Sequence, residues 1–426
     1  MVKSFRIVFR RTDGDRVESM GKDKGKTGKK NRSDKKARYG FFMWLTRIIV
    51  LPVIKFSYRA KIKKFKGLDK KNCLILFNHQ TPFDQFFVLS AFKKTIRLVS
   101  TEDVTSNGFA SRLLTGAYGI IPIKKQTSDV KAVLECMQIA KNGGTIAVAP
   151  EGNRTYSGET CYIRPSIAGL IKVLKLPVVF FKIRGGYGVE PRWSNVKRKG
   201  KMTCEVTRVL EYDEYKDLSK DEIYETVKTE LYENESDDGE KFYSKKSAEK
   251  LERVFYVCPY CGFAEFTSKN DAVTCKKCNR TAKYGADKTF SGDFPFKTVL
   301  EWYRFQEDYI VKADMTGYKE TPAFTDIAKM SRVIPYVRKA PIFKGAEVSL
   351  FSDRITVKSG KAENILPFDK ISSVSVLGRN KLNVYFGDDI YQFKGKKSFN
   401  ALKYMHFYYV YSQKKEGKES GFFFGI

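Results

Sequence analysis

A histidine and an aspartate five positions apart, His79 and Asp84, are the residues of this sequence best suited to proton-transfer chemistry. They follow an apolar run, residues 73–77, whose length and composition predict a buried strand. Thr81 and Pro82 suit the N-cap and first position of the next helix, which would bring Asp84 close to the strand exit. An aspartate bonded to one imidazole nitrogen fixes the tautomer and leaves the other nitrogen to take a proton from a hydroxyl. The alternative is that Asp84 only caps the helix and His79 is a turn residue.

Three further blocks follow in the sequence. Residues 119–125 form an apolar segment that ends in two lysines, Lys124 and Lys125. Residues 150–155 follow a predicted strand and contain Glu151, Gly152 and Arg154. Arg154 can present a fork of N–H donors to a phosphate, and Gly152 lets the backbone approach it closely. An ion pair between Glu151 and Arg154 that only braces the loop is the alternative.

The order of these blocks resembles that of the 1-acylglycerol-3-phosphate acyltransferase family over residues 67 to about 212. Asn78-His79 and Asp84 match its N-H-x-x-x-x-D box, and residues 150–155 are similar to its E-G-T-R-S box, with Asn153 and Thr155 replacing threonine and serine. Residues 176–181 resemble its apolar strand, although Phe180 stands where proline is common, and this strand lines either the acyl site or the core.

The resemblance implies transfer of a fatty acyl group from an acyl-CoA or acyl-carrier-protein thioester to a lysophospholipid. The expected acceptor is the sn-2 hydroxyl of 1-acylglycerol 3-phosphate, and the product is phosphatidate. His79 and Asp84 would be catalytic, and the substrate would contact Lys125, Glu151, Gly152 and Arg154. Lys125 replaces the usual arginine, which keeps the charge but loses the two-pronged geometry. Another lysophospholipid acceptor is an alternative.

Four cysteines form two C-x-x-C pairs separated by 13 residues: Cys258, Cys261, Cys275 and Cys278. Two such pairs offer the four thiolates of a tetrahedral zinc site, and four thiolates leave no open position for chemistry. We therefore predict a structural zinc ribbon, with a redox-active pair as the main alternative.

The chain carries a formal net charge of +31, which predicts a polyanionic partner. Residues 41–58 are apolar but are interrupted by Arg47, Pro52 and Lys55, and lysines and arginines follow them. This pattern favours a helix lying in the headgroup region of an anionic membrane, monotopic or peripheral on the cytoplasmic face, over a membrane-spanning helix. A helix buried against the catalytic domain is the alternative. A zinc-containing nucleic-acid-binding or scaffold protein is a rival interpretation, but it leaves the ordered blocks unexplained, so nucleic acid is not an expected partner.

The expected fold class is α/β: an acyltransferase-type domain with an N-terminal membrane-associated helix, a zinc ribbon and a β-barrel-like C-terminal domain. Short alternating strands after residue 346, followed by one helix, resemble a pleckstrin-homology or GRAM-like domain. The predicted boundaries are a disordered basic arm at 1–39, the membrane-associated helix at 40–66, the acyltransferase domain at 67–236, the ribbon at 252–287 and the PH/GRAM-like domain at 340–414.

Overall fold

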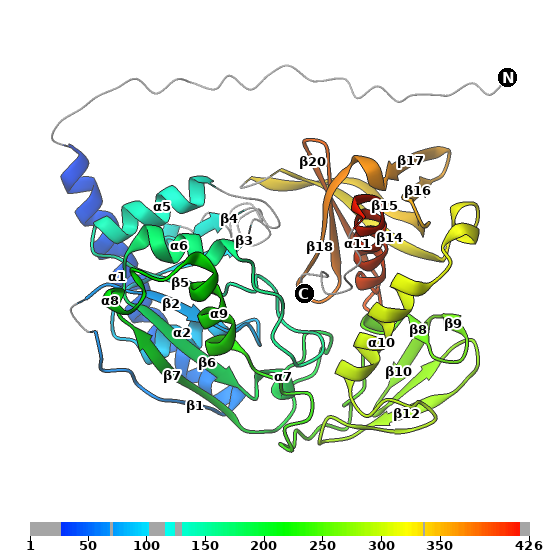
Figure 1. Cartoon of the computed structure of the whole chain (residues 1–426), viewed down its shortest axis with the longest axis horizontal. Coiled ribbons are helices and arrows are strands. Elements are labelled where there is room, and N and C mark those ends of the chain that lie inside the picture. The colour runs from blue at the N-terminus through cyan, green and yellow to red at the C-terminus, as the bar shows by residue number, and fades with distance from the viewer. Residues whose placement is uncertain (1–26, 69–70, 102–115, 124–129, 335–336, 418–426) are drawn as a thin grey trace. The chain divides into compact units, whose positions relative to one another are not determined.

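The computed structural model describes residues 27–68, 71–101, 116–123, 130–334 and 337–417 (Figure 1). Residues 39–426 form one compact unit, separate from residues 1–38. Lys125, predicted as a substrate contact, lies outside the described residues.

The region predicted as an acyltransferase domain, called the acyltransferase region below, is built on a seven-stranded sheet of order β1-β7-β6-β2-β5-β3-β4. All neighbouring strands are parallel except β6 and β7, which are antiparallel. The strands are β1 (Ala60–Ile62), β2 (Leu74–Phe77), β3 (Ile96–Thr101), β4 (Ile121–Ile123), β5 (Thr145–Val148), β6 (Val178–Arg184) and β7 (Met202–Leu210). The helices are α1 (Thr27–Tyr58), α2 (Asp84–Ala91), α5 (Val130–Lys141), α6 (Ser166–Leu174), α7 (Gly186–Val189), α8 (Tyr212–Tyr215) and α9 (Lys220–Leu231).

Helices cover both faces of this sheet. Its central strands are therefore buried on both sides, which is why their sequences are continuous apolar runs. Successive side chains of a strand point to opposite faces, and β2 shows this directly. Leu74 and Leu76 lie in one core with residues of α5, α6 and α9, whereas Ile75 and Phe77 lie in another core with residues of α1 and α2. The strand predicted before His79 is therefore confirmed as the buried centre of a mixed α/β sheet.

Within residues 39–58, helix α1 packs one side against the sheet domain. Met43, Ile54 and Tyr58 are buried, and Arg47 donates to the carbonyls of Phe92 and Lys94 at 2.8 Å each, just beyond the end of α2. The helix begins at Thr27, so part of the arm predicted as disordered through residue 39 is helical. It ends at Tyr58 and leads into β1, which pairs with β7, so the segment predicted as a helix through residue 66 contains a strand of the sheet.

The cysteine-containing region is a small all-β unit followed by a helix. Its elements are η1 (Leu251–Arg253), β8 (Val257–Cys258), β9 (Gly262–Phe263), β10 (Phe266–Lys269), β11 (Ala272–Cys275), β12 (Thr281–Tyr284), β13 (Phe290–Gly292) and α10 (Val299–Lys312). The last four strands form one antiparallel sheet, and β8 pairs with β9. Trp302 of α10 stacks on Phe255 with ring centroids 3.9 Å apart, which holds the helix on this unit.

The C-terminal region is a curled antiparallel half-barrel of order β17-β16-β15-β14-β20-β19-β18. Its elements are η2 (Thr316–Lys319), β14 (Phe324–Ile334), β15 (Arg338–Leu350), β16 (Arg354–Ser359), β17 (Ala362–Pro367), η3 (Phe368–Lys370), β18 (Ile371–Leu377), β19 (Lys381–Phe386), β20 (Asp389–Gly395) and α11 (Leu402–Glu416). Helix α11 packs against the sheet, where Tyr404 donates to the carbonyl of Val348 and Tyr408 to that of Ile371 (Figure 1). The predicted plan of meandering strands followed by one helix is confirmed, but β14 begins before the predicted start at residue 340.

The ribbon and the half-barrel share one hydrophobic core. Val273 of the ribbon, Trp302 of α10 and Val384 of the half-barrel belong to the same cluster of buried residues, which also includes Tyr156 and Trp193 from the acyltransferase region. These three regions are therefore packed together through side chains.

Candidate active site

Three loops meet at one edge of the large sheet. Strands β2, β5 and β6 are parallel neighbours, so their carboxyl ends lie at the same edge. Their loops carry His79 after β2, Glu151 and Arg154 after β5, and Arg192 after β6. Ligand sites of open α/β sheets form at this edge. The topology thus brings together residues that are more than a hundred positions apart in the sequence.

His79 and Asp84 form a hydrogen-bonded pair. Nδ1 of His79 lies 2.7 Å from Oδ2 of Asp84, whose carboxylate is fully buried. The same carboxylate accepts the backbone N–H groups of Gln80 and Thr81, at 2.6 and 2.9 Å. These bonds curl the loop back on itself, so α2 begins at Asp84, later than the predicted start at Pro82. Asp84 therefore both orders the turn before the helix and orients the imidazole.

The other imidazole nitrogen, Nε2 of His79, makes no hydrogen bond within the described part of the chain. Burial lowers the pKa of His79, and its hydrogen bond to Asp84 opposes that shift. A lowered pKa keeps the imidazole neutral at neutral pH, which is the form that accepts a proton.

Glu151 holds the His79 loop by its backbone. One carboxylate oxygen accepts the N–H of His79 and the other accepts the N–H of Cys161, both at 2.8 Å. No ion pair joins Glu151 to Arg154, although both residues are described, so the bracing pair considered from the sequence is wrong. Asn78 fixes the other side of the loop, because its side-chain amide exchanges two 2.8 Å hydrogen bonds with the backbone of Ile183.

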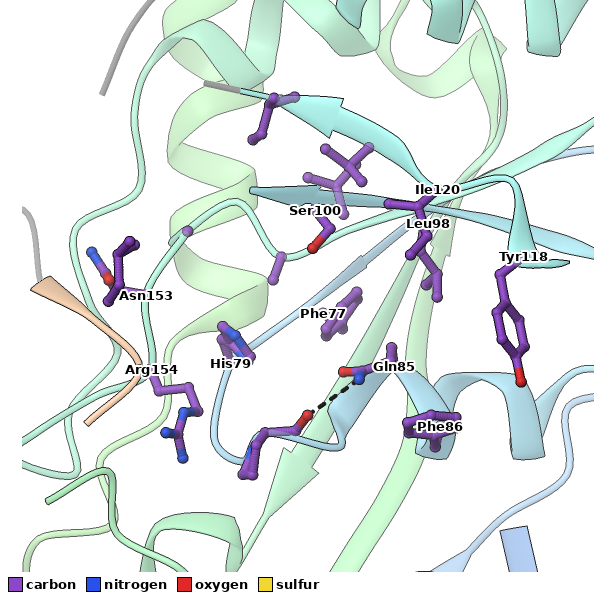
Figure 2. A pocket seen from close by; sticks show the side chains of 18 of the residues that line it. Phe77, His79, Gln85, Phe86, Leu98, Ser100, Tyr118, Ile120, Asn153 and Arg154 are labelled. Carbon is purple, nitrogen blue, oxygen red and sulfur yellow. Dashed lines mark hydrogen bonds between the residues drawn. The ribbon is translucent and has the colours of Figure 1, made fainter. Parts of the chain in front are cut away.

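His79 faces a cavity of about 470 Å³. In Figure 2, His79, Asn153 and Arg154 lie on one side of this cavity, with Phe86 and Tyr118 on the other. Much of the lining is apolar, including Phe77, Phe86, Leu89, Leu98 and Ile120. Tyr118 is bonded to Thr46 of α1 with 2.5 Å between the hydroxyl oxygens, so the apolar helix supports this wall.

The polar side of the cavity carries a buried guanidinium whose hydrogen bonds are incomplete among the described residues. Arg154 is 7% exposed, and its Nη1 has no hydrogen-bond partner among the described residues. Burial, followed by repulsion from Arg192, lowers the pKa of Arg154 to about 10. Gly152, which also lines the cavity, has φ +64, a conformation that favours glycine. The loop therefore presents a buried guanidinium beside an open stretch of backbone.

Several residues of this site were missed by sequence reasoning. Arg192 and the half-barrel residues Leu377 and Gly378 line the cavity, and none of them belongs to a predicted motif. The only local signal for Arg192 is the glycine-rich turn that follows β6, at residues 185–188. Phe180 and Phe181, left open between acyl site and core, are fully buried in the cores on opposite faces of the sheet and do not line the cavity.

The four cysteines lie together, as predicted. Their Sγ atoms are all within 4.8 Å of one another, and the shortest separations are 3.4, 3.8 and 3.9 Å. A tetrahedral zinc with Zn–S bonds of about 2.3 Å requires sulfurs about 3.8 Å apart, and a disulfide requires about 2.05 Å. The cluster (Cys258, Cys261, Cys275, Cys278) is compatible with zinc.

The histidine–aspartate pair lies at the carboxyl end of β2, the central strand of the sheet. Residues 53–183 match the family described as Acyltransferase, and the chain therefore contains an acyltransferase domain. No curated protein matches the chain.

Two solved structures are similar to parts of the chain. One is the crystal structure of the 1-acyl-sn-glycerophosphate (LPA) acyltransferase PlsC from Thermotoga maritima, at 17% identity and a TM-score of 0.35. This match covers 46% of this chain and 93% of that chain. The other is the solution structure of the N-terminal PH domain of the human ARAP2 protein, at 15% identity and a TM-score of 0.17. It covers 25% of this chain and 86% of that chain.

Proposed function

We propose that this protein is a membrane-associated acyltransferase that acylates the sn-2 hydroxyl of 1-acylglycerol 3-phosphate to give phosphatidate. The observation that carries the proposal is the His79–Asp84 pair, because His79 lines the same cavity as Arg154. Among the described residues, Nη1 of Arg154 has no hydrogen-bond partner. The family match supports acyl transfer, and the buried cation supports a phosphate-bearing acceptor.

The proposed reaction needs no protein nucleophile. The acceptor hydroxyl gives its proton to Nε2 of His79 while its oxygen attacks the thioester carbonyl, and Asp84 stabilises the imidazolium that forms. The new C–O bond replaces the C–S bond, and the proton passes from His79 to the departing thiolate. Asp84 keeps the proton of neutral His79 on Nδ1, so Nε2 is the basic nitrogen.

The cavity offers different surroundings to the two ends of a lysophospholipid. Its aromatic and aliphatic lining suits acyl chains, and Arg154 suits the phosphate. Gly152 leaves backbone open beside that arginine. Lys125, the other proposed phosphate ligand, follows β4, which lies next to β3 in the same sheet.

We place the enzyme on a membrane surface through α1. Within residues 39–58, one side of this helix is buried against the sheet domain and the other exposes six large apolar side chains: Phe41, Trp44, Ile48, Ile49, Val53 and Phe56. Phe56 is 87% exposed. The helix is long and apolar enough to cross a membrane, but its packed side favours a position in the plane of the headgroups.

Acyl-transfer assays with a panel of lysophospholipids and with both thioester donors test this function. We expect wild type to prefer a phosphate monoester acceptor over monoacylglycerol and His79→Ala to abolish transfer without unfolding the protein. Arg154→Ala should lose the preference for phosphate, and Arg154→Lys should recover only part of it, because lysine keeps the charge but not the fork.

Two results would overturn parts of the proposal. Turnover close to wild type in folded His79→Ala would remove the pair from the mechanism. Equal losses of Arg154→Ala on phosphate-bearing and phosphate-free acceptors would mean that Arg154 does not recognise phosphate. A preference of wild type for a different lysophospholipid would leave an acyltransferase with another acceptor.

A further inference from the structure

The turn between β18 and β19 of the half-barrel forms part of the cavity wall. Leu377 and Gly378 of this turn line the same cavity as His79 and Arg154. The acyltransferase match ends at residue 183, so this wall comes from a region outside the matched domain. The proposed active site is therefore built from two regions of the chain.

Hydrogen bonds from the acyltransferase region hold this turn at three backbone carbonyls. Arg192 donates to Val376 and Gly378 at 2.8 and 2.7 Å, and the hydroxyl of Tyr156 donates to Arg379 at 2.9 Å. Arg192 also donates to the backbone carbonyl of Arg154 at 2.8 Å. One guanidinium, 2% exposed, thus joins the loop of Arg154 to the turn of the half-barrel.

Positive charge gathers where the two regions meet. Arg379 bonds Glu190 at 2.5 Å, and Glu190 also accepts the hydroxyl of Tyr58 at the end of α1. Arg192 and Arg379 both repel Arg154 electrostatically, and the two carboxylates of Glu190 and Asp84 oppose that repulsion, so three arginines face two carboxylates here. Two buried guanidinium nitrogens, Nη1 of Arg154 and Nε of Arg379, have no hydrogen-bond partner among the described residues. Unpaired buried donors with surplus positive charge favour an anionic ligand.

We propose that the half-barrel completes the acceptor site: Arg154 and Arg379 bind the phosphate of the acceptor from opposite regions of the chain, and Arg192 positions them by joining the two loops. This inference rests on the proposed function and deepens it. The C-terminal region thereby determines which acceptors the enzyme accepts, while His79 and Asp84 carry out the same chemistry on each.

The test compares KM and kcat for 1-acylglycerol 3-phosphate and for monoacylglycerol in wild type and Arg379→Gln. We expect Arg379→Gln to raise KM for the phosphate acceptor roughly five- to tenfold, with little change in kcat. The phosphate-free acceptor should be unaffected, and Arg379→Lys should restore most of the affinity. The matched control is Arg354→Gln, which removes an arginine of the same half-barrel that is paired with Asp353 at 2.8 Å and lies on β16, away from the turn that contributes Leu377 and Gly378 to the cavity wall.

Arg379→Gln leaves Glu190 without its ion-pair partner, so the variant could fail to fold. The double variant Arg379→Gln/Glu190→Gln replaces the pair with two amides and should show the same selective rise in KM. An unchanged KM in either folded variant, or equal losses on both acceptors, would overturn the inference. If wild type prefers the phosphate acceptor and the variants have the same KM for it, the role of Arg379 is refuted while the proposed function stands. If wild type shows no preference for the phosphate acceptor, the proposed function itself is refuted.

Discussion

Replacing Glu151 by glutamine tests whether this residue positions the His79 loop or contacts the acceptor, as the resemblance implied. Each carboxylate oxygen accepts one backbone N–H, from His79 and Cys161, at 2.8 Å. An amide keeps one acceptor oxygen but turns an NH₂ group toward the second N–H. One buried backbone N–H is left without an acceptor, which costs about 1–3 kcal/mol.

Glu151→Gln should therefore lower the unfolding temperature. If the lost hydrogen-bond energy raises the activation free energy because His79 is misplaced, kcat should fall roughly ten- to a hundredfold. A change of about 1.4 kcal/mol corresponds to a factor of ten. The acceptor KM should stay close to wild type, because Glu151 is not among the described residues that line the cavity.

Thermal unfolding and steady-state kinetics on the same preparations measure these effects. The matched control is Glu235→Gln, a buried carboxylate that accepts the N–H of Gly185 at 2.7 Å and does not line the cavity. It should leave both stability and kcat near wild type, because glutamine keeps the bond to Gly185 and the other carboxylate oxygen of Glu235 has no partner among the described residues. An unfolding temperature and kcat like wild type, with a raised acceptor KM, would refute the positioning role of Glu151 and restore the substrate contact.

Three further predictions address the pH dependence, the cysteine cluster and helix α1. The acid limb of kcat/KM should lie below pH 6.5, because the base acts when neutral and burial lowers the pKa of His79; a limb above pH 6.5 would contradict this. Zinc should co-purify at about one ion per chain and its removal should lower the unfolding temperature, whereas elemental analysis finding none in protein with reduced cysteines would exclude the ribbon. Replacing Trp44 and Phe56 by serine should release the protein from anionic vesicles in flotation assays, while salt alone should only weaken binding; unchanged flotation of the double variant would show that α1 is not the anchor.

Local sequence signals predicted the centre of the acyltransferase domain well. The strand before His79 is an uninterrupted apolar run, and the spacing from His79 to Asp84 is short enough for one turn to bring them together. The cysteine cluster was also predicted from local sequence, because two C-x-x-C pairs at this spacing supply the four ligands of one tetrahedral site.

The parts that could not be predicted depend on contacts between distant segments. Arg192 and Leu377 reach the cavity only because β6 lies beside β2 and the half-barrel turn docks there, and no sequence pattern near either residue encodes that. The role of Glu151 was open for a similar reason, since its partners are backbone groups whose position follows from the fold. Strand β14 was missed because its burial alternates irregularly around two register shifts with β15.

The attachment of α1 affects how the enzyme would meet its substrates. Arg47 attaches α1 to the carbonyls after α2, and the helix leads directly into β1, an edge strand of the sheet. Helix α1 is therefore held rigidly against the sheet domain. On a membrane, this rigid attachment fixes the height and tilt of the cavity above the lipid surface. Acceptors would then arrive by lateral diffusion within the leaflet, a search in two dimensions, and their surface density would govern the rate more than their bulk concentration.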